Sequence, residues 1–393
     1  MKKILIASTI LATLSAPVIA KDINVGIILG FTGPIESLTP TMAAAAELAL
    51  SEASNSGNLL GGQKVVPIRG DSTCIDAAAA TSTAERLITS EGVVAIMGAD
   101  CSGVTTAIAN NVAVPNGVVM VSPSATSPAL STIDDNGFFH RTAPSDARQG
   151  QVLTDILIGR GIKEVAVTYT NNDYGKGLAD SFGGAFRAKG GVISISAAHE
   201  DGKADYSAEV GALSASGSKY LAVFGYLDQG GKGIVQASID SDAFRNFVMA
   251  DGMVGESILA AIGSGMNGTI ATVPGGSSGA DAFLAYAKEN GVAGDGPYAP
   301  ESYDAAALIV LAIQAAGSTD RAAIQSKMNM VANAPGKKIG PGELGKALKI
   351  IAAGGDVDYQ GATNVEFDAV GEVFGSYKEL EVNDGKWVTV KVH

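Results

Sequence analysis

Polar side chains follow directly after several of the strands expected in this sequence. The hydroxyls of Ser102 and Thr126 come after two early strands, and Tyr174, Tyr226 and Asp251 come after three later ones. In open α/β sheets, ligands bind outside the carboxyl ends of the strands. We therefore expect these five residues to meet at one binding site.

The set matches the two charged ends of a free α-amino acid. Ser102, at a helix start, supplies a hydroxyl, nearby N–H groups and the positive end of the helix dipole to a carboxylate, and Thr126 adds a hydroxyl. Asp251 and the carbonyl of Ser124 accept hydrogen bonds from an ammonium group. The two tyrosines offer ring faces to an aliphatic side chain. Each residue alone also has an ordinary structural use, as a cap or a packing group, so the prediction depends on their shared position at one sheet edge.

Short β-rich runs alternate with Ala-rich helical runs along most of the chain. Runs that are apolar throughout, such as residues 93–97, are typical of parallel strands covered by helices on both faces. The expected strands are Ile23–Leu29, Lys64–Ile68, Val93–Met97, Gly117–Val121, Glu164–Thr170, Gly191–Ser196, Tyr220–Gly225, Phe247–Met249 and Thr269–Val273. The expected helices include Thr41–Ala53, Ala77–Thr89, Ala147–Arg160 and Ala204–Ser214. This order predicts an α/β protein with right-handed βαβ units in doubly wound parallel sheets.

Two interruptions divide the chain. The first series of strands pauses at residues 122–144, which hold three prolines, and a second series then begins. After a Gly-rich stretch that starts at Pro274 come three helices with no strong strand between them, at Asp281–Asn290, Ser302–Ala316 and Arg321–Ala332. These helices need a sheet to cover, and the first series is the nearest candidate. We therefore expect two lobes and more than one crossing between them.

The first twenty residues are typical of an export signal. Lys2 and Lys3 precede an apolar run from Ile4 to Leu14, and Val18 and Ala20 form a V-x-A cleavage pattern. The run is too short to span a bilayer, and a buried N-terminal element is the alternative. The next residue is Lys and not Cys, so we expect no lipid anchor. The mature chain is expected to be free in the periplasm or outside the cell, without membrane insertion.

Composition narrows the range of functions. With 46% apolar residues the chain can form well-packed cores, and its net charge of −13 argues against binding nucleic acid or anionic lipid. The two cysteines, Cys74 and Cys101, suit a disulfide in an exported protein, with two buried thiols as the alternative. No pair of histidines or cysteines has the spacing of a metal site. We expect neither a metal nor a cofactor.

Taken together, these segments resemble the Leu/Ile/Val-binding proteins of bacterial ABC importers, a type I periplasmic binding family. The likeness covers nearly the whole mature chain. The segments that carry it are Gly33-Pro34, Asp71-Ser72-Thr73-Cys74, Gly98 to Ser102, Ser122 to Pro128, Tyr174-Gly175-Lys176-Gly177 and Asp304-Ala305-Ala306.

The resemblance implies a binding site and a disulfide. Ser102 and Thr126 would hold the ligand carboxylate, while Thr126, Ser124 through its carbonyl and Asp251 would meet the ammonium. The remaining implied lining residues are Leu38, Tyr298, Tyr174, Tyr226, Ala125 and Cys101. Cys74 and Cys101 match the first-lobe disulfide of the family. Two residues depart from the pattern: Asp100 stands where an apolar residue is usual, and Leu38 where an aromatic one is frequent.

The resemblance also implies an architecture and a partner. We expect a signal peptide at 1–20, an N-terminal lobe of 21–141 and 274–365, and a C-terminal lobe of 142–273 and 366–393. Hinge segments are expected near 141–144, 272–275 and 360–368. A monomer would close over its ligand and present it to an inner-membrane ABC permease, with no catalysis. The other ligands in view are polar amino acids, amides and aromatic acids, and the other role is a sensory one beside a chemoreceptor.

One sequence pattern suggests an enzyme instead. Residues 275–279 read Gly-Gly-Ser-Ser-Gly, a G-x-S-x-G match between a strand and a helix, as in serine hydrolases. The serine would need a later histidine, and only His393 follows it. A dinucleotide fingerprint at 263–268 follows a helical run and not a strand, so its required context is missing.

Overall fold

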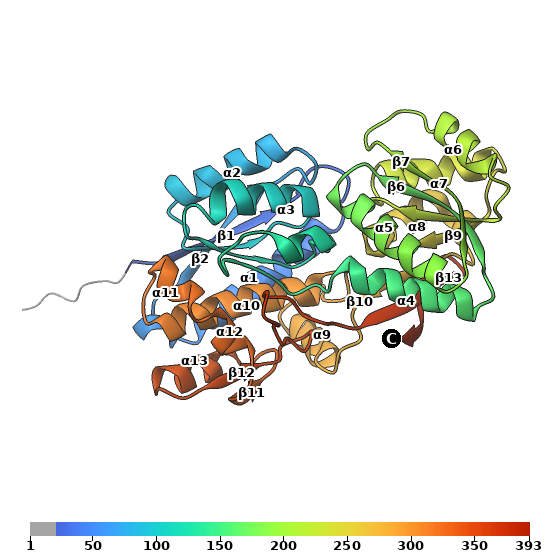
Figure 1. Ribbon diagram of the computed structural model, residues 1–393. Helices are drawn as coiled ribbons and strands as arrows, with labels where there is room; N and C mark the ends of the chain where they lie inside the picture. Colours follow the sequence, from blue (N-terminus) through green and yellow to red (C-terminus); the bar gives the residue numbers. More distant parts are fainter. Residues whose placement is uncertain (1–20) are drawn as a thin grey trace, which may run out of the picture.

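The computed structural model describes residues 21–393, so the expected signal peptide lies outside the described residues. Two α/β lobes lie side by side (Figure 1), each built around its own sheet, with a small two-stranded sheet beside the first lobe. The lobes are linked by several passages of the chain, so neither lobe is one continuous stretch of sequence.

The first lobe is built on a five-stranded sheet in which every pairing is parallel. Its order is β2-β1-β3-β4-β5. The strands are β1 Ile23–Leu29, β2 Val65–Asp71, β3 Ala95–Gly98, β4 Val119–Ser122 and β5 Phe139–Arg141. Every residue of β3, β4 and β5 is buried, as expected for strands covered on both faces.

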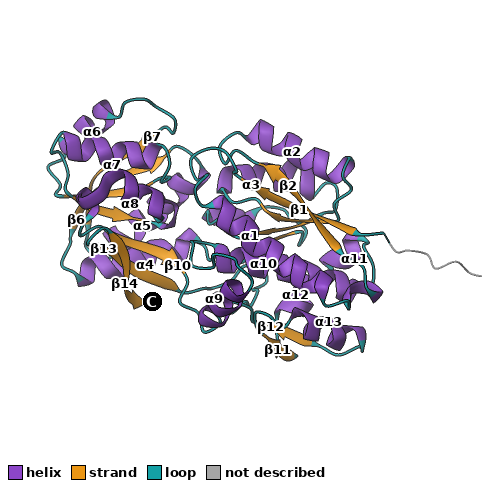
Figure 2. Ribbon diagram, turned by 180° about the vertical axis from the view of Figure 1, so that it is seen from behind, coloured by secondary structure: helices purple, strands orange, loops and turns teal. Residues whose placement is uncertain are grey.

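Helices from both ends of the described chain belong to this lobe. Early ones are α1 Thr39–Asn55, α2 Ala77–Thr89 and α3 Ser102–Ile108, which continues into a π-helical turn at Ala109–Ala113. Late ones are α9 Ala280–Glu289, α10 Ala299–Ala316, α11 Arg321–Gln325, α12 Met328–Ala332 and α13 Leu344–Ala352. The buried α10 packs along α1 and against β3 and β4 (Figure 2), so the expectation that the late helices return to the first sheet is confirmed for α10. Strands β11 Lys337–Ile339 and β12 Val357–Tyr359 form the small sheet.

The second lobe is built on a seven-stranded sheet in the order β14-β13-β10-β9-β8-β6-β7. Its parallel strands are β6 Glu164–Thr170, β7 Val192–His199, β8 Tyr220–Phe224, β9 Asn246–Met249 and β10 Ile270–Pro274. Its helices are α4 Asp146–Gly159, α5 Asp173–Ala188, α6 Ser207–Ser214, α7 Gly230–Asp240 and α8 Glu256–Ile262.

The C-terminal hairpin is an addition to the expected parallel pattern. Strands β13 Tyr377–Asn383 and β14 Lys386–Val392 pair antiparallel, and β13 also pairs antiparallel with β10. The turn between them holds Asp384 and Gly385 at φ values of 49° and 72°, the positive pair that a type I′ turn requires. The sheet is therefore mixed at this edge, where the sequence analysis expected no strands.

Within residues 21–393 no single helix is long and apolar enough to cross a membrane. The one combination that passes by length and composition, α10 with residues 321–332, is bent by 114°, and α10 is buried in the first lobe.

Candidate ligand-binding site

A pocket lies between the two lobes, at the carboxyl ends of strands from both sheets. Its walls are formed by Ile35, Leu38, Met42, Asp100, Cys101, Ser102, Ser124, Tyr174, Tyr226, Asp251, Gly252 and Tyr298. Nine of the eleven predicted site residues are in this set. The other two, Ala125 and Thr126, come directly after Ser124 in the chain and are fully buried.

The lobes meet around this pocket. On the rim, Asp228 of the second lobe accepts hydrogen bonds from the backbone N–H of Ser37 (2.9 Å) and the hydroxyl of Ser257 (2.7 Å), and its own N–H donates to Pro34 O (3.0 Å). The remaining free volume of the pocket is about 20 Å³, which is close to the space that one water molecule needs. A guest of amino-acid size therefore requires the lobes or the lining side chains to move apart.

The first-lobe wall presents hydroxyl groups. Ser102 begins α3 and is buried, and its Oγ accepts a hydrogen bond from the Ser127 N–H (3.1 Å), which leaves its own proton available to donate. The Ser124 hydroxyl donates to Asp100 O (3.1 Å). Thr126 is fully buried, and its Oγ1 has no hydrogen-bond partner within residues 21–393. This wall therefore holds hydroxyl groups with unused hydrogen-bonding capacity.

Asp251 forms the charged centre of the opposite wall. It begins a 3₁₀ turn, Asp251–Met253, directly after β9, and it accepts hydrogen bonds from the hydroxyl of Tyr174 (3.2 Å) and from that of Tyr298. Tyr174 belongs to the second lobe and Tyr298, at the start of α10, to the first. Burial raises the pKa of Asp251, and the hydrogen bonds from the two tyrosines oppose that rise. One carboxylate thus contacts both lobes.

Two stacked tyrosine rings complete the second-lobe wall. The rings of Tyr174 and Tyr226 lie 5.3 Å apart with an angle of 18° between their planes. The hydroxyl of Tyr174 also accepts the N–H of Gly252 (3.2 Å). A Cβ on Gly252 would lie 2.6 Å from Gly225 O and 2.9 Å from that hydroxyl, so only glycine fits there. The stack is therefore held in place by the backbone that follows β9.

Asp100 lines the pocket, but its carboxylate is bound to the first lobe. Its oxygens accept hydrogen bonds from the N–H of Gly30 (2.5 Å), the N–H of Cys101 (2.9 Å) and the hydroxyl of Ser72 (3.1 Å). Burial raises its pKa, and these hydrogen bonds act against that rise. The carboxylate ties together the loops that follow β1, β2 and β3.

The disulfide between Cys74 and Cys101 is present, with Cα atoms 5.1 Å apart. This confirms the predicted pairing. Because Cys101 directly precedes Ser102, the bond anchors the start of the hydroxyl-bearing wall to the loop after β2.

Comparison with known proteins identifies the family. The profile of the periplasmic binding protein family matches residues 22–343, well over half of the chain. This chain is a periplasmic binding protein.

Curated relatives of this binding protein have names that fit the family. The "Leu/Ile/Val-binding protein homolog 3" of Brucella melitensis is 29% identical over 316 residues, covering 78% of this chain and 82% of the relative. The "Chemotactic signal transduction system substrate-binding protein BasB" of Halobacterium salinarum is 27% identical, covering 93% and 88%.

Solved structures share the two-lobed fold. The branched-chain amino acid transporter substrate-binding protein LivJ from Streptococcus pneumoniae, in complex with isoleucine, has a TM-score of 0.77 at 22% identity, covering 95% of this chain and 99% of that one. A solute-binding protein from R. palustris in complex with 4-hydroxybenzoate has a TM-score of 0.76 at 20% identity, covering 95% and 97%.

Asp146, a buried acid of this binding protein, was not identified from the sequence. Asp146 begins α4, is fully buried, and neither carboxylate oxygen has a hydrogen-bond partner within residues 21–393. Burial, and after it the negative charge of Asp251, raises the pKa of Asp146 well above its usual value. Its backbone N–H donates to Thr126 O (2.8 Å), which places it beside the first-lobe wall. In sequence it resembles an ordinary acid in the first turn of a helix, so no pattern singled it out.

The possible hydrolase serine has a structural use. The hydroxyl of Ser277 donates to Ala362 O. The three histidines have other surroundings: His140 packs on Phe367, His199 bonds to Thr168 (2.8 Å) and His393 pairs with Glu379 (2.8 Å). Within residues 21–393 no group of three or more His, Cys, Asp or Glu side chains is arranged to hold a metal ion. The family is one of binding proteins.

Proposed function

We propose that this protein captures a branched-chain or closely related amino acid between its lobes and delivers it to an inner-membrane ABC permease. The observation that carries the proposal is the buried carboxylate of Asp251, which reaches both lobes and faces a wall of hydroxyl groups across one pocket. The names of curated relatives and the isoleucine complex of a structural neighbour support the same ligand class.

The two walls suit the two ends of a zwitterion. A buried ammonium needs an anionic partner, which Asp251 supplies, with the second buried carboxylate of Asp146 nearby. A buried carboxylate needs donors, and the hydroxyls of Ser102 and Thr126 still have capacity to donate. In this proposal the ammonium takes the place of the Tyr298 hydroxyl on Asp251.

The rest of the pocket suits an aliphatic side chain. Ile35, Leu38 and Met42 form an apolar face, and the stacked tyrosine rings form another. Leu38 is smaller than the aromatic residue that is frequent at this position in the family, which suits a branched side chain at this end of the pocket. Asp100 does not make this end polar, because its oxygens are engaged by the first lobe.

An aromatic acid is the second candidate, because a structural neighbour holds 4-hydroxybenzoate. Such a ligand has a carboxylate but no ammonium. It would leave the buried charge of Asp251 without a cationic partner. This costs several kcal/mol unless the Asp251 carboxylate takes up a proton. The acids around this pocket therefore favour an amino acid.

Capture is proposed to proceed by rotation of the lobes. We assign the N-terminal lobe to 21–141 and 274–365, the C-terminal lobe to 142–273 and 366–393, and the hinge to segments near 141–144, 272–275 and 360–368. The ligand first binds to the hydroxyl-bearing wall of the open form. Closure of the lobes then brings Tyr174, Tyr226 and Asp251 of the second lobe into contact with the ligand. The rim contacts of Asp228 with Ser37 and Pro34 hold the closed form.

Export and partners follow from the same proposal. Residues 1–20 serve as a signal peptide, the mature protein is a monomer in the periplasm, and the permease recognises its closed form. A sensory role beside a chemoreceptor is the second candidate role, because one relative is named as a chemotactic substrate-binding protein. Capture of inner-membrane partners by the ligand-loaded protein distinguishes a permease from a receptor.

Calorimetry tests the ligand class. The protein is unfolded, dialysed and refolded to remove carried-over ligand, then titrated with leucine, isoleucine, valine, glutamine and benzoate. We expect the three branched-chain amino acids to bind at least tenfold more tightly than the other two. Stronger binding of benzoate, or no binding by any amino acid, would falsify the proposal.

A further inference from the structure

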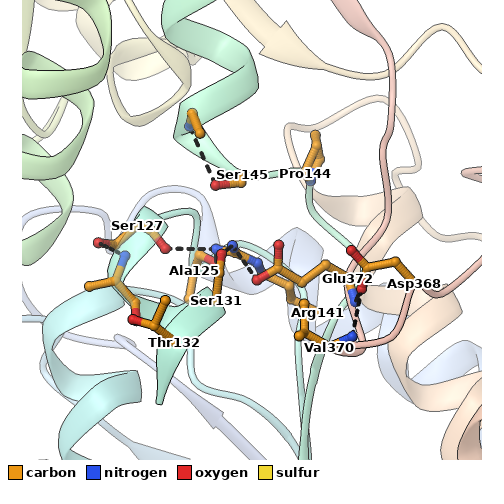
Figure 3. A network of polar contacts seen from close by, with 12 residues as sticks. Ala125, Ser127, Ser131, Thr132, Arg141, Pro144, Ser145, Asp368, Val370 and Glu372 are labelled. Atoms are coloured by element: carbon orange, nitrogen blue, oxygen red, sulfur yellow. Dashed lines mark hydrogen bonds and ion pairs between the residues drawn. The ribbon is translucent and has the colours of Figure 1, made fainter. Parts of the chain in front are cut away.

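Arg141 lies at the end of β5, where the chain leaves the first sheet, and its side chain is completely buried. Its guanidinium donates to four acceptors (Figure 3). One nitrogen donates to Ala125 O (3.0 Å) and Ser127 O (2.9 Å), and the other to Ser131 Oγ (3.0 Å) and Glu372 Oε1 (2.6 Å). A buried cation with this many directed bonds fixes the groups around it.

The two carbonyl acceptors lie on either side of Thr126. The carbonyl of Thr126 itself accepts the N–H of Asp146 (2.8 Å), so three successive carbonyls of this loop are turned toward the first crossing between the lobes. The N–H groups of Ala125 and Ser127 donate to Ser122 Oγ (3.0 Å) and Ser102 Oγ (3.1 Å). The Thr126 Oγ1 is left without a partner within the described part of the chain.

The far side of the guanidinium is anchored on the last crossing segment. Glu372 lies in a turn closed by Asp368, whose carboxylate accepts the N–H groups of Val370 (2.9 Å) and Glu372 (3.1 Å). The backbone of the same turn also bonds directly to the first crossing, because the Arg141 N–H donates to Gly371 O (3.0 Å). Figure 3 shows this turn and the 125–131 loop on opposite sides of the guanidinium.

We propose that Arg141 is a positioning residue that sets the 125–127 loop for ligand, with Glu372 as its anchor on the last crossing segment. The inference rests on the proposed function, since the ligand is taken to meet Ser124 and Thr126. Arg141 does not line the pocket. Arg141 affects affinity by holding the carbonyls of Ala125 and Ser127 in place. It also links the ligand-binding loop to the hinge segments.

The test must separate positioning from stability. Removing Arg141 alone leaves the Glu372 charge buried and unpaired. This destabilises the fold whether or not Arg141 positions the loop. The double variant Arg141→Met with Glu372→Met replaces the pair by apolar side chains, a change that often preserves stability. It still leaves the two loop carbonyls without their donor.

Two measurements are made on the whole protein. Calorimetry with leucine is expected to give an affinity at least tenfold weaker in the double variant. Its chemical unfolding midpoint should fall less than that of Arg141→Met alone, because neutral loop groups and not a buried charge lose their partner. Hydrogen exchange of the ligand-free protein is expected to be faster in residues 124–128 and unchanged in β8 and β9. Unchanged affinity together with unchanged exchange in that loop overturns the proposal.

Further variants keep the outcome decisive. Should the double variant not fold, Arg141→Lys replaces it. Affinity is again expected to fall, because one ammonium cannot bond to both carbonyls and Glu372 as the planar guanidinium does. Full affinity with unchanged loop exchange overturns the proposal. The matched control is Arg160→Gln, which removes an arginine paired with Glu379 (2.5 Å) and Glu381 (2.7 Å) inside the second lobe and should leave affinity unchanged. If the unchanged protein binds no amino acid, the proposed function fails while the exchange measurement still decides the role of Arg141.

Discussion

Asp100 and Asp251 are equally buried, each 2% exposed, and both line the same pocket. Their partners differ. Asp100 is held by two backbone N–H groups and one serine of its own lobe, and it has no bond across the cleft. Asp251 is held by two tyrosine hydroxyls, one from each lobe. In the proposed rotation of the lobes, the backbone donors of Asp100 stay in place, whereas the Tyr298 hydroxyl moves away from Asp251 with the first lobe.

The difference in hydrogen-bond partners indicates different roles for the two acids on the two sides of the cleft. The Asp100 cluster (Gly30, Ser72, Asp100 and the Cys74–Cys101 disulfide) fixes the loops after three strands, and the hydrogen bonds of its carboxylate are made within the first lobe. The Asp251 cluster (Tyr174, Asp251 and Tyr298) can exchange one of its donors for a ligand ammonium. Equal burial therefore does not mean equal function, and perturbing each cluster should have different consequences.

Reduction of the disulfide is expected to have the largest effect on stability. The bond closes a loop with a sequence separation of 27, which on the loop-entropy argument stabilises the fold by about 3–4 kcal/mol. Denaturant unfolding with and without reductant measures this loss. Leucine affinity is expected to change by less than about threefold, because the Asp100 cluster retains its hydrogen bonds. A loss of binding at full stability would contradict these different roles.

Asp251→Asn is expected to have the largest effect on binding. Removing the charged partner of a buried ammonium costs about 2–3 kcal/mol, so leucine affinity should fall by roughly 100-fold. The ligand-free protein should be as stable as before or slightly more so, because a buried charge has been removed. Calorimetry and thermal unfolding of the same preparations measure both quantities. An affinity within twofold of the unchanged protein would remove Asp251 from the site.

Asp100→Asn is expected to show the reverse pattern with a smaller effect. The amide retains one acceptor oxygen, but its NH₂ group then faces backbone donors, so the free energy of unfolding should fall by about 1–2 kcal/mol. Affinity should fall much less than in the Asp251→Asn variant. An Asp100→Asn variant with an unchanged free energy of unfolding that binds leucine as poorly as Asp251→Asn would contradict this distinction between the two acids.

The sequence allowed the general architecture to be predicted, because fully apolar strands and Ala-rich helices alternate in it. All nine expected strands are present within a few residues of their predicted bounds. The C-terminal hairpin was not predicted, although Asp384-Gly385 is a hairpin turn signal, because the alternating valines of β14 form a largely exposed edge strand and not a buried run.

The lining of the pocket was predictable where its residues follow strands directly. Tyr298 and Leu38 came only from the family resemblance, since neither follows a strand. Whether Asp100 turns toward the pocket could not be read from the sequence, because its carboxylate is directed by the N–H of Gly30, 70 residues away. Asp146 was missed because its burial depends on how the start of α4 meets the first-lobe loop at Thr126, 20 residues earlier in the chain.

The pH dependence of binding gives the finest distinction between the two acids. Burial raises the pKa of Asp251 above its unfolded value, so the folded, ligand-free protein binds that proton more tightly than the unfolded chain does. Its contribution to stability is therefore favourable at low pH and is lost as pH rises through the interval between the two pKa values. A ligand ammonium reverses this preference, because it favours the ionised carboxylate.

Leucine affinity should consequently weaken as pH falls below the pKa of Asp251 in the free protein, by up to about tenfold per pH unit. Calorimetry from about pH 8 down to about pH 4.5 follows the affinity through the pH interval above the ordinary aspartate pKa, which is the direction in which burial moves the pKa of Asp251. The Asp251→Asn variant should bind weakly with a much flatter profile, whereas Asp100→Asn should keep the slope, because the Asp100 carboxylate bonds only to groups of its own lobe. The same slope in both variants would mean that another group, with Asp146 as the first candidate, carries the proton that ligand displaces.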